Sequence, residues 1–66
     1  MQLIMKTEFD NLRINDKHSY TTDSNGDKQV VKIYCREQLI AKKLSQKKSI
    51  RYFGISTYQD YLTNEY

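Results

Sequence analysis

The stretch 28–51, KQVVKIYCREQLIAKKLSQKKSIR, decides the expected fold because a strand pattern at its start is followed by a helix pattern. It also holds most of the positive charge, with eight Lys or Arg residues against one acidic residue, Glu37, and a net charge of +7. Residues 1–27 and residues 52–66 each carry a net charge of −2, so the whole chain of 66 residues carries +3. A basic block between mildly acidic ends is the main indication of function.

A β-hairpin is predicted around Asn25-Gly26, since both residues tolerate the positive φ that a type I′ turn requires. With these two residues at the tip, Asp23 lies opposite Lys28 and forms a cross-strand ion pair. One face of the hairpin is then apolar and the other is polar and basic. The first face contains His18, Tyr20, Val31, Ile33 and Cys35, and the second contains Lys17, Ser19, Thr21, Lys28, Val30, Lys32 and Tyr34.

The segments on either side of the hairpin follow different periods. Residues 2–9 alternate in polarity, which predicts a half-buried strand, and residues 12–14 either continue it after a bulge or begin another strand. A helix is predicted from residue 36 or 37, and it either ends or bends at Ser45-Gln46 or continues to Gly54, which has the freedom to end it with a left-handed φ. Ser56 and Gln59 form a capping-box pattern for a second helix, whose apolar stripe contains Tyr58, Tyr61, Leu62 and Tyr66.

These elements predict an α+β fold in one domain spanning residues 1–66. A small antiparallel sheet of two or three strands, with its hairpin turn at Asn25-Gly26, is followed by one or two helices packed on one face. The single cysteine excludes an internal disulfide, and no Cys/His cluster suggests a metal site or a cofactor. Because so short a chain builds a small core, we expect stability from close packing or from a homodimer. No apolar run is long enough to span a membrane, and the lone thiol fits the cytoplasm.

The basic block is the first candidate site. Lysines on one helix, with an arginine at its end and strand lysines beside it, could neutralise several phosphates of a nucleic acid. The alternative is a solvated helix face, but the run lacks the interleaved glutamates of such faces. The predicted nucleic-acid contacts are Lys28, Lys32, Lys42, Lys43, Lys47, Lys48 and Arg51.

The segment from Gly54-Ile55-Ser56 through Tyr58-Gln59 resembles the turn and second helix of ribbon-helix-helix antitoxin repressors. The resemblance implies that residues 28–34 form the DNA-reading ribbon of a dimer, and that a first helix follows from residue 36. The strand side chains that would face the major groove are Lys28, Val30 and Lys32, while Ser56 and Thr57 would lie near a phosphate. The chain departs from that family in its longer gap before Gly54 and in its additional N-terminal strand and hairpin. Residues 44–62 also resemble a helix-turn-helix, although Asp60 falls where an apolar residue of the recognition helix is expected. The order of a hairpin and a helix is similar to that of the arm-binding domains of tyrosine integrases.

The tyrosines give a second class of function. Tyr34, Tyr52 and Tyr66 are predicted to be exposed contacts in a protein interface, because tyrosine buries a large area and keeps a polar group. Catalysis is not expected, since His18 is predicted to be packed and Cys35 has no orienting partner. The first hypothesis is therefore a small, dimeric, non-enzymatic DNA-binding regulator of a phage or mobile element. The alternative is a phage inhibitor, of the anti-CRISPR or anti-defence kind, that blocks an acidic host protein or nuclease complex.

Overall fold

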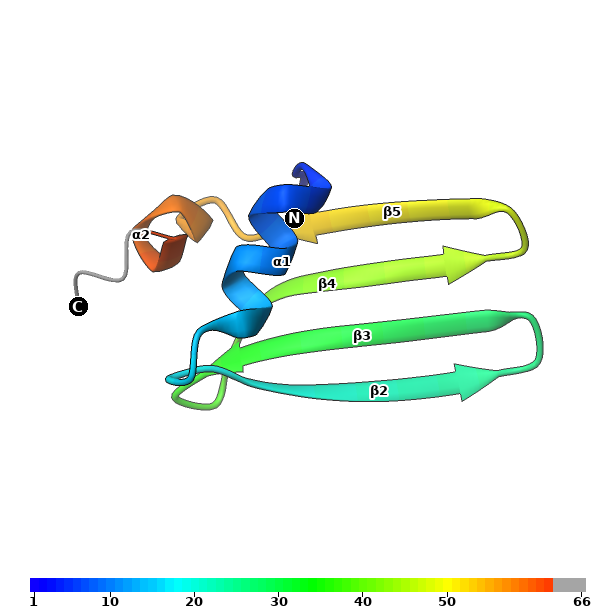
Figure 1. The fold of residues 1–66 in the computed structure, drawn as a ribbon, viewed down its shortest axis with the longest axis horizontal. Coiled ribbons are helices and arrows are strands. Elements are labelled where there is room, and N and C mark those ends of the chain that lie inside the picture. Colours follow the sequence, from blue (N-terminus) through cyan, green and yellow to red (C-terminus); the bar gives the residue numbers. More distant parts are fainter. Residues whose placement is uncertain (63–66) are drawn as a thin grey trace.

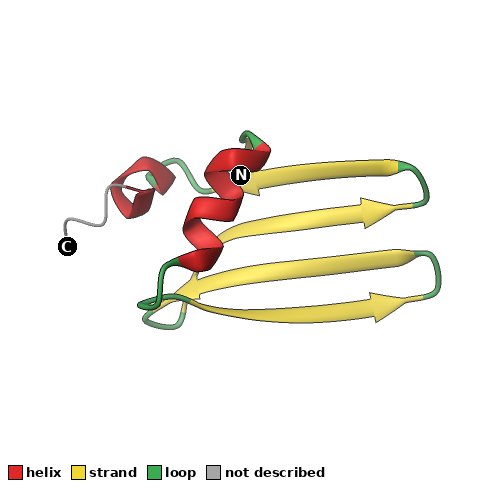
Figure 2. Cartoon of the chain, viewed as in Figure 1, coloured by secondary structure: helices red, strands yellow, loops and turns green. Residues whose placement is uncertain are grey.

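The computed structural model describes residues 1–62 and consists of one antiparallel sheet with two short helices (Figures 1 and 2). In chain order the elements are β1 (Gln2–Leu3), α1 (Lys6–Ile14), β2 (Ser19–Asn25), β3 (Lys28–Cys35), β4 (Gln38–Gln46), β5 (Ser49–Gly54) and α2 (Tyr58–Leu62). The five strands lie in the order β1-β5-β4-β3-β2, and every neighbouring pair is antiparallel. Helix α1 crosses one end of the sheet, and the four long strands extend beyond it (Figure 1).

The predicted fold class was wrong in the number of strands and in the position of the helices. The sheet has five strands rather than two or three, and a helix precedes the hairpin. The region predicted as a helix from residue 36 forms β4 and β5 instead. Two tight turns there contain no glycine or proline, and Arg36 (φ 52°), Glu37 (φ 69°) and Lys47 (φ 53°) adopt the positive φ that glycine usually supplies. Because these turns contain none of the usual turn residues, the sequence pattern predicted one continuous helix where two strands are joined by a turn.

The predicted hairpin is confirmed, but its register is wrong by one residue at the tip. Gly26 and Asp27 form the tip, and Asn25 pairs with Lys28. Gly26 has φ 62° whereas Asn25 and Asp27 have no positive φ, so glycine occupies the first central position, as in a type II′ turn. Asp23 consequently lies opposite Val30 and not opposite Lys28. The shift preserves the alternation, so the two predicted faces of β3 are correct.

The predicted strand over residues 2–9 was also wrong beyond its first residues. A short β1 pairs with the end of β5, and α1 then buries Phe9 and Leu12, three residues apart. The backbone N–H of Met5 donates to a Glu8 carboxylate oxygen at 2.8 Å, which is half of a capping box. The alternation of polarity over residues 2–9 therefore predicted the wrong element, and the Met5–Glu8 hydrogen bond marks the start of a helix there.

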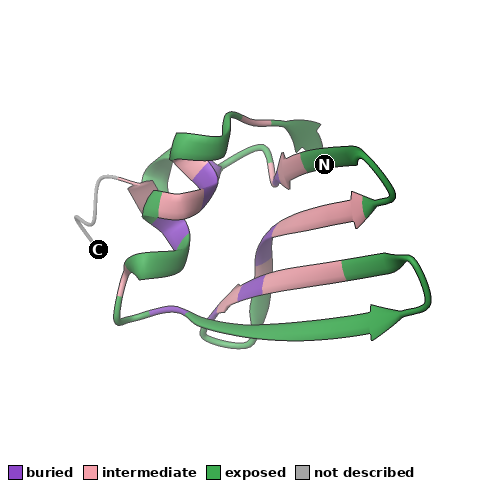
Figure 3. Ribbon diagram, turned by 45° about the vertical axis from the view of Figure 1, so that its right-hand side comes forward, coloured by how far each residue is buried: buried purple, intermediate pink, exposed green. Residues whose placement is uncertain are grey.

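The core lies where α1 crosses the sheet (Figure 3). Phe9 and Leu12 pack on Ile33, Cys35, Ile40 and Ala41. Ile40 and Ala41 are both fully buried although they are adjacent on β4, because the register shifts opposite Ile33 and Tyr34 and leaves Ile40 in a bulge. The bulge is therefore what brings Ile40 to the core beside Ala41.

Helix α2 packs against α1. Gly54 ends β5 rather than a helix, and a Cβ at this position would lie 3.1 Å from Ile4 Cγ2 and from Tyr58 Cβ, so a larger residue would have to push these neighbours away. The predicted second helix is confirmed as α2, with Tyr58 buried, whereas Tyr66 lies outside the described residues. Over residues 1–62, neither helix has the length and apolar character needed to cross a membrane.

Candidate nucleic-acid interface

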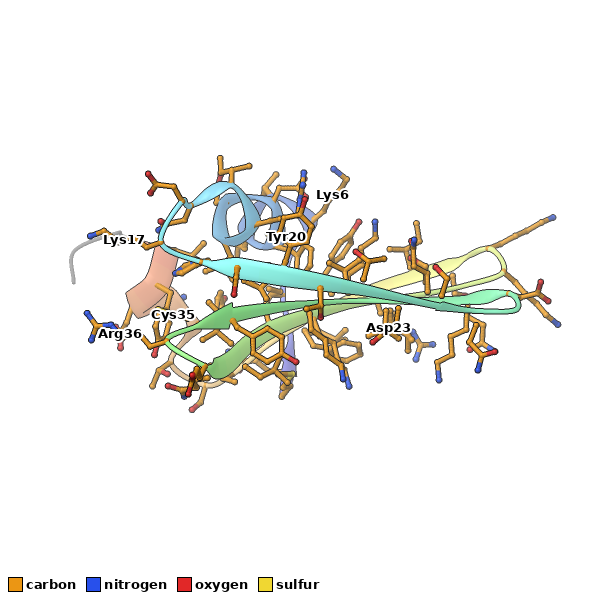
Figure 4. The ribbon with its side chains drawn as sticks, turned by 90° about the horizontal axis from the view of Figure 1, so that it is seen from below. Lys6, Lys17, Tyr20, Asp23, Cys35 and Arg36 are labelled. Carbon is orange, nitrogen blue, oxygen red and sulfur yellow. The ribbon has the colours of Figure 1, made fainter. Side chains whose placement is uncertain are left out.

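The two faces of the sheet differ in what covers them. Side chains alternate along each strand, and cross-strand partners share a face, so Ile33 on the α1 side places Lys32 and Tyr34 on the other side. Figure 4 shows the sheet edge-on, with Tyr20 and α1 on one side and Asp23 on the other. We call the side away from α1 the open face. Its side chains are Leu3, Ser19, Thr21, Asp23, Asn25, Lys28, Val30, Lys32, Tyr34, Leu39, Lys42, Leu44, Gln46, Ser49, Arg51 and Phe53.

Four of the seven predicted nucleic-acid contacts lie on the open face: Lys28, Lys32, Lys42 and Arg51. Lys43 points to the α1 side, where its Nζ lies 5.9 Å from the centre of the Tyr52 ring. Lys47 and Lys48 form the tip of the β4–β5 hairpin, and the Lys47 backbone N–H donates to the Asp27 carbonyl at the neighbouring tip, 3.4 Å away. The prediction that the lysines lie along one helix was therefore wrong, although a subset shares one surface.

Two of these cations are direct cross-strand neighbours. Lys32 of β3 pairs with Lys42 of β4, and both side chains are half-buried. Like charges directly opposite each other destabilise a sheet. The open face carries one acidic residue on its strands, Asp23 on the outer strand, and within residues 1–62 neither Lys32 nor Lys42 forms an ion pair. The centre of this face is thus an uncompensated positive surface.

Aromatic and aliphatic groups lie between the charges. Phe53 continues the Lys32–Lys42 row onto β5, and the Lys42 Nζ lies 5.8 Å from the centre of its ring. Tyr34 is half-buried one residue along β3 from Ile33. Beside the β4–β5 turn, the open face contains a hollow of about 280 Å³. It is lined by Leu44, Gln46, Lys47, Ser49 and Arg51. Cations, stacking surfaces and a shallow hollow therefore occupy one continuous face.

The three predicted interface tyrosines have different positions. Tyr34 lies on the open face, as a contact residue would. Tyr52 lies on the α1 side, half-buried, with its ring centre 5.3 Å from that of Phe9, so the prediction that it is exposed was wrong. Tyr66 lies outside the described residues. The sequence analysis did not predict Phe53 as a contact residue, because its side chain reaches the open face only if residues 49–54 form a strand.

The remaining polar groups of the core hold helices in place. His18 is buried as predicted, with its Nδ1 2.8 Å from the Leu12 carbonyl oxygen and its ring in edge contact with Tyr61. The Tyr58 hydroxyl donates to Glu8 at 2.8 Å, and this hydrogen bond, with burial, raises the pKa of Tyr58 above its usual value. Over residues 1–62, no group of three or more His, Cys, Asp or Glu residues is placed to hold a metal ion.

No family model matches this chain, and neither the curated proteins nor the solved structures contain a match to it.

Proposed function

We propose that this protein binds nucleic acid, with duplex DNA as the first candidate, through the open face of its sheet. The observation that carries the proposal is the Lys32–Lys42 pair, two half-buried cations placed side by side without a counter-ion in the described part of the chain. A bound phosphate backbone supplies the missing negative charge. Lys28 and Arg51 on the same face extend the contact along the strands.

The shape of the face supports this use. A sheet that is uncovered on one side can lie against the phosphate backbone of a duplex or against an unpaired strand. Tyr34 and Phe53 offer rings on which unpaired bases can stack. Lys28, Val30 and Lys32, the strand residues that the ribbon-helix-helix resemblance assigns to DNA reading, all lie on this face. The resemblance itself stays a prediction, and the segment it assigns to the first helix is β4.

The wider role we propose is that of a small, non-enzymatic regulator encoded by a phage or mobile element and acting in the cytoplasm. The buried free thiol of Cys35 is compatible with a reducing compartment. The small core fits a protein whose function lies on its surface rather than in a closed catalytic pocket.

The test compares two adjacent lysines on opposite faces. Lys42→Glu places a negative charge on the open face, whereas Lys43→Glu makes the same change on the α1 side. Fluorescence anisotropy with a labelled duplex of random sequence, at about 50 and 200 mM salt, measures both variants. Four phosphate contacts predict that binding by the unmodified protein weakens by about 100-fold between these salt concentrations.

We expect Lys42→Glu to abolish binding at the lower salt and Lys43→Glu to reduce it only slightly. Equal losses for the two variants would mean that binding follows net charge and not the open face. A labelled single strand of the same length serves as a second probe, and preference for it would assign the face to unpaired bases. Absence of binding to either probe would refute the proposal.

The inhibitor alternative is favoured by one observation. Val30 lies between Lys28 and Lys32 on the open side of β3. Its cross-strand partner is Leu44, and both side chains are half-buried. An aliphatic pair contributes little to phosphate binding but suits the centre of a protein interface. If neither nucleic-acid probe binds, capture of an acidic protein that is lost on Val30→Asp would favour this second function.

A further inference from the structure

The two edges of the sheet differ in how they are protected (Figure 1). At the β5 edge, β1 pairs with Phe53 and Gly54, and the Ile4 backbone N–H donates to the Tyr52 carbonyl at 2.9 Å. The rest of β5 carries Arg51 and follows Lys48, and charged side chains of this kind discourage pairing with another strand. The β5 edge is therefore partly covered and partly charged.

In the described part of the chain, the β2 edge has no covering strand, and Asp23 is its one charged residue. All seven of its residues, Ser19–Asn25, are exposed, and within residues 1–62 no strand pairs with its outer side. It contains no lysine, arginine or proline, and its ladder with β3 runs over seven pairs with no register shift. A long, regular edge strand without a bulge or a cation is a template for another strand.

We propose that β2 pairs with β2 of a second copy of this chain, antiparallel and about a twofold axis perpendicular to the sheet. Such pairing keeps each face continuous, so residues on one face pair with residues of the same face. The register that uses all seven residues places Thr22 opposite Thr22 of the second copy. In that register Asp23, the one charged residue of β2, lies opposite Thr21 of the second copy. Moving the axis by one residue to Asp23 would instead oppose two carboxylates, which is unfavourable.

This register also suits the other side chains of the strand. On the α1 side, Tyr20 is 53% exposed, and it would lie opposite Ser24 of the second copy, which leaves room for the ring. On the other side, Ser19 would lie opposite Asn25 and could form a hydrogen bond. The two open faces would lie on the same side of one ten-stranded sheet, because the axis is perpendicular to it. The inference does not depend on what the open face binds.

The first experiment is disulfide trapping of the full chain without nucleic acid. In the proposed register, the two Thr22 Cα atoms are about 4.5–5.5 Å apart, within the range for a disulfide. Thr22→Cys should therefore cross-link to a covalent dimer under mild oxidation. Ser24→Cys is the matched control on the same face, because its two copies would be about 13 Å apart along the strands. Cys35, which is buried, is common to both variants.

The second experiment measures the equilibrium dimer by sedimentation over a range of concentrations. Thr21→Asp places two carboxylates opposite each other at two symmetric sites and should raise the dissociation constant roughly 2- to 30-fold. Thr21→Lys places a cation opposite Asp23 at the same sites and should lower it. Thermal melts followed by circular dichroism check that both variants fold.

The results separate the alternatives cleanly. Selective trapping through Thr22→Cys together with opposite shifts for the two Thr21 variants would establish the β2 interface. A protein that sediments as a monomer at every concentration would overturn it. So would a dimer in which Ser24→Cys cross-links as readily as Thr22→Cys, or one that responds equally to both Thr21 variants, because another surface would then join the copies.

Discussion

The α1 side and the open face of the same sheet differ in almost every property except their backbone. On β3, Ile33 is fully buried beneath α1, and its neighbours Lys32 and Tyr34 point to the opposite side and are half-buried. On β4, Lys42 and Lys43 are adjacent and of the same type, but one lies beside Phe53 on the open face and the other beside Tyr52. The difference shows that one face contributes the core while the other is free to carry charge. Substitutions on the two faces should therefore affect different measurements.

The largest expected effect is on stability, at the core. Ile33→Ala removes a fully buried side chain beneath α1 and should lower the free energy of unfolding by about 2–5 kcal/mol. Val30→Ala, three residues away on the open face and half-buried, should lower it by about 1 kcal/mol or less. Urea denaturation measures both values. Ile33→Val, with an expected loss of about 0.5–1.5 kcal/mol, keeps the comparison measurable if the alanine variant does not fold.

A comparable loss for Val30→Ala would break the comparison between the faces. It would mean that the open face is also packed, as it would be if a second copy or another element covered it. The difference between the two variants thus tests whether this side of the sheet is free in solution.

The next effect compares two tyrosines on opposite faces. Tyr52→Ala removes the ring that packs on Phe9 and should lower the free energy of unfolding by about 2 kcal/mol, since the side chain is half-buried. Its effect on nucleic-acid affinity, measured by anisotropy below the melting temperature, should be small. Tyr34→Ala should leave the melting temperature nearly unchanged and weaken binding to a single strand by about 1–3 kcal/mol, if bases stack on its ring.

Two controls accompany these variants. Tyr34→Phe keeps the ring and should retain most of the affinity, because stacking does not need the hydroxyl. If Tyr34→Ala lowers stability as much as Tyr52→Ala, then Tyr34 belongs to the packing of the sheet and its role in binding would be withdrawn.

The sequence predicted the hairpin and the composition of its faces, but not the sheet to which it belongs. Alternation of polarity along residues 28–35 is a local property, so the predicted faces of this strand are correct although the predicted register at Asn25-Gly26 is wrong. The β3–β4 and β4–β5 turns could not be read, because Arg36, Glu37 and Lys47 adopt positive φ without being glycine, which local propensity disfavours. That conformation is set by the pairing of the strands around each turn, which is a tertiary effect.

The placement of the basic side chains could be predicted only in part, for a related reason. Charge alone singles out these residues as a group, but which of them share a surface depends on whether side chains repeat every two residues, as in a strand, or every 3.6 residues, as in a helix. A helical reading kept Lys42 and Lys43 together, and the strand separates them. For the same reason, the structure has Lys47 and Lys48 in a turn rather than on a helix, and it has Phe53 on the open face.

The smallest expected effect is the most informative, because it separates binding from folding at one residue. Lys42→Glu replaces a repulsive pair with an attractive pair opposite Lys32 and should raise the free energy of unfolding by about 0.2–1 kcal/mol. The gain should shrink at high salt, since screening weakens both the repulsion and the new attraction. Each variant also loses a contact with an aromatic ring, Phe53 for Lys42 and Tyr52 for Lys43. Lys43 lies opposite Val31 and has no like-charged cross-strand partner, so Lys43→Glu should give no such gain. Urea denaturation at low and high salt measures the difference. If Lys42→Glu is more stable and binds nucleic acid more weakly, the Lys32–Lys42 pair contributes to binding and lowers the stability of the fold. If the variant loses both stability and affinity, the pair instead contributes to the stability of the sheet.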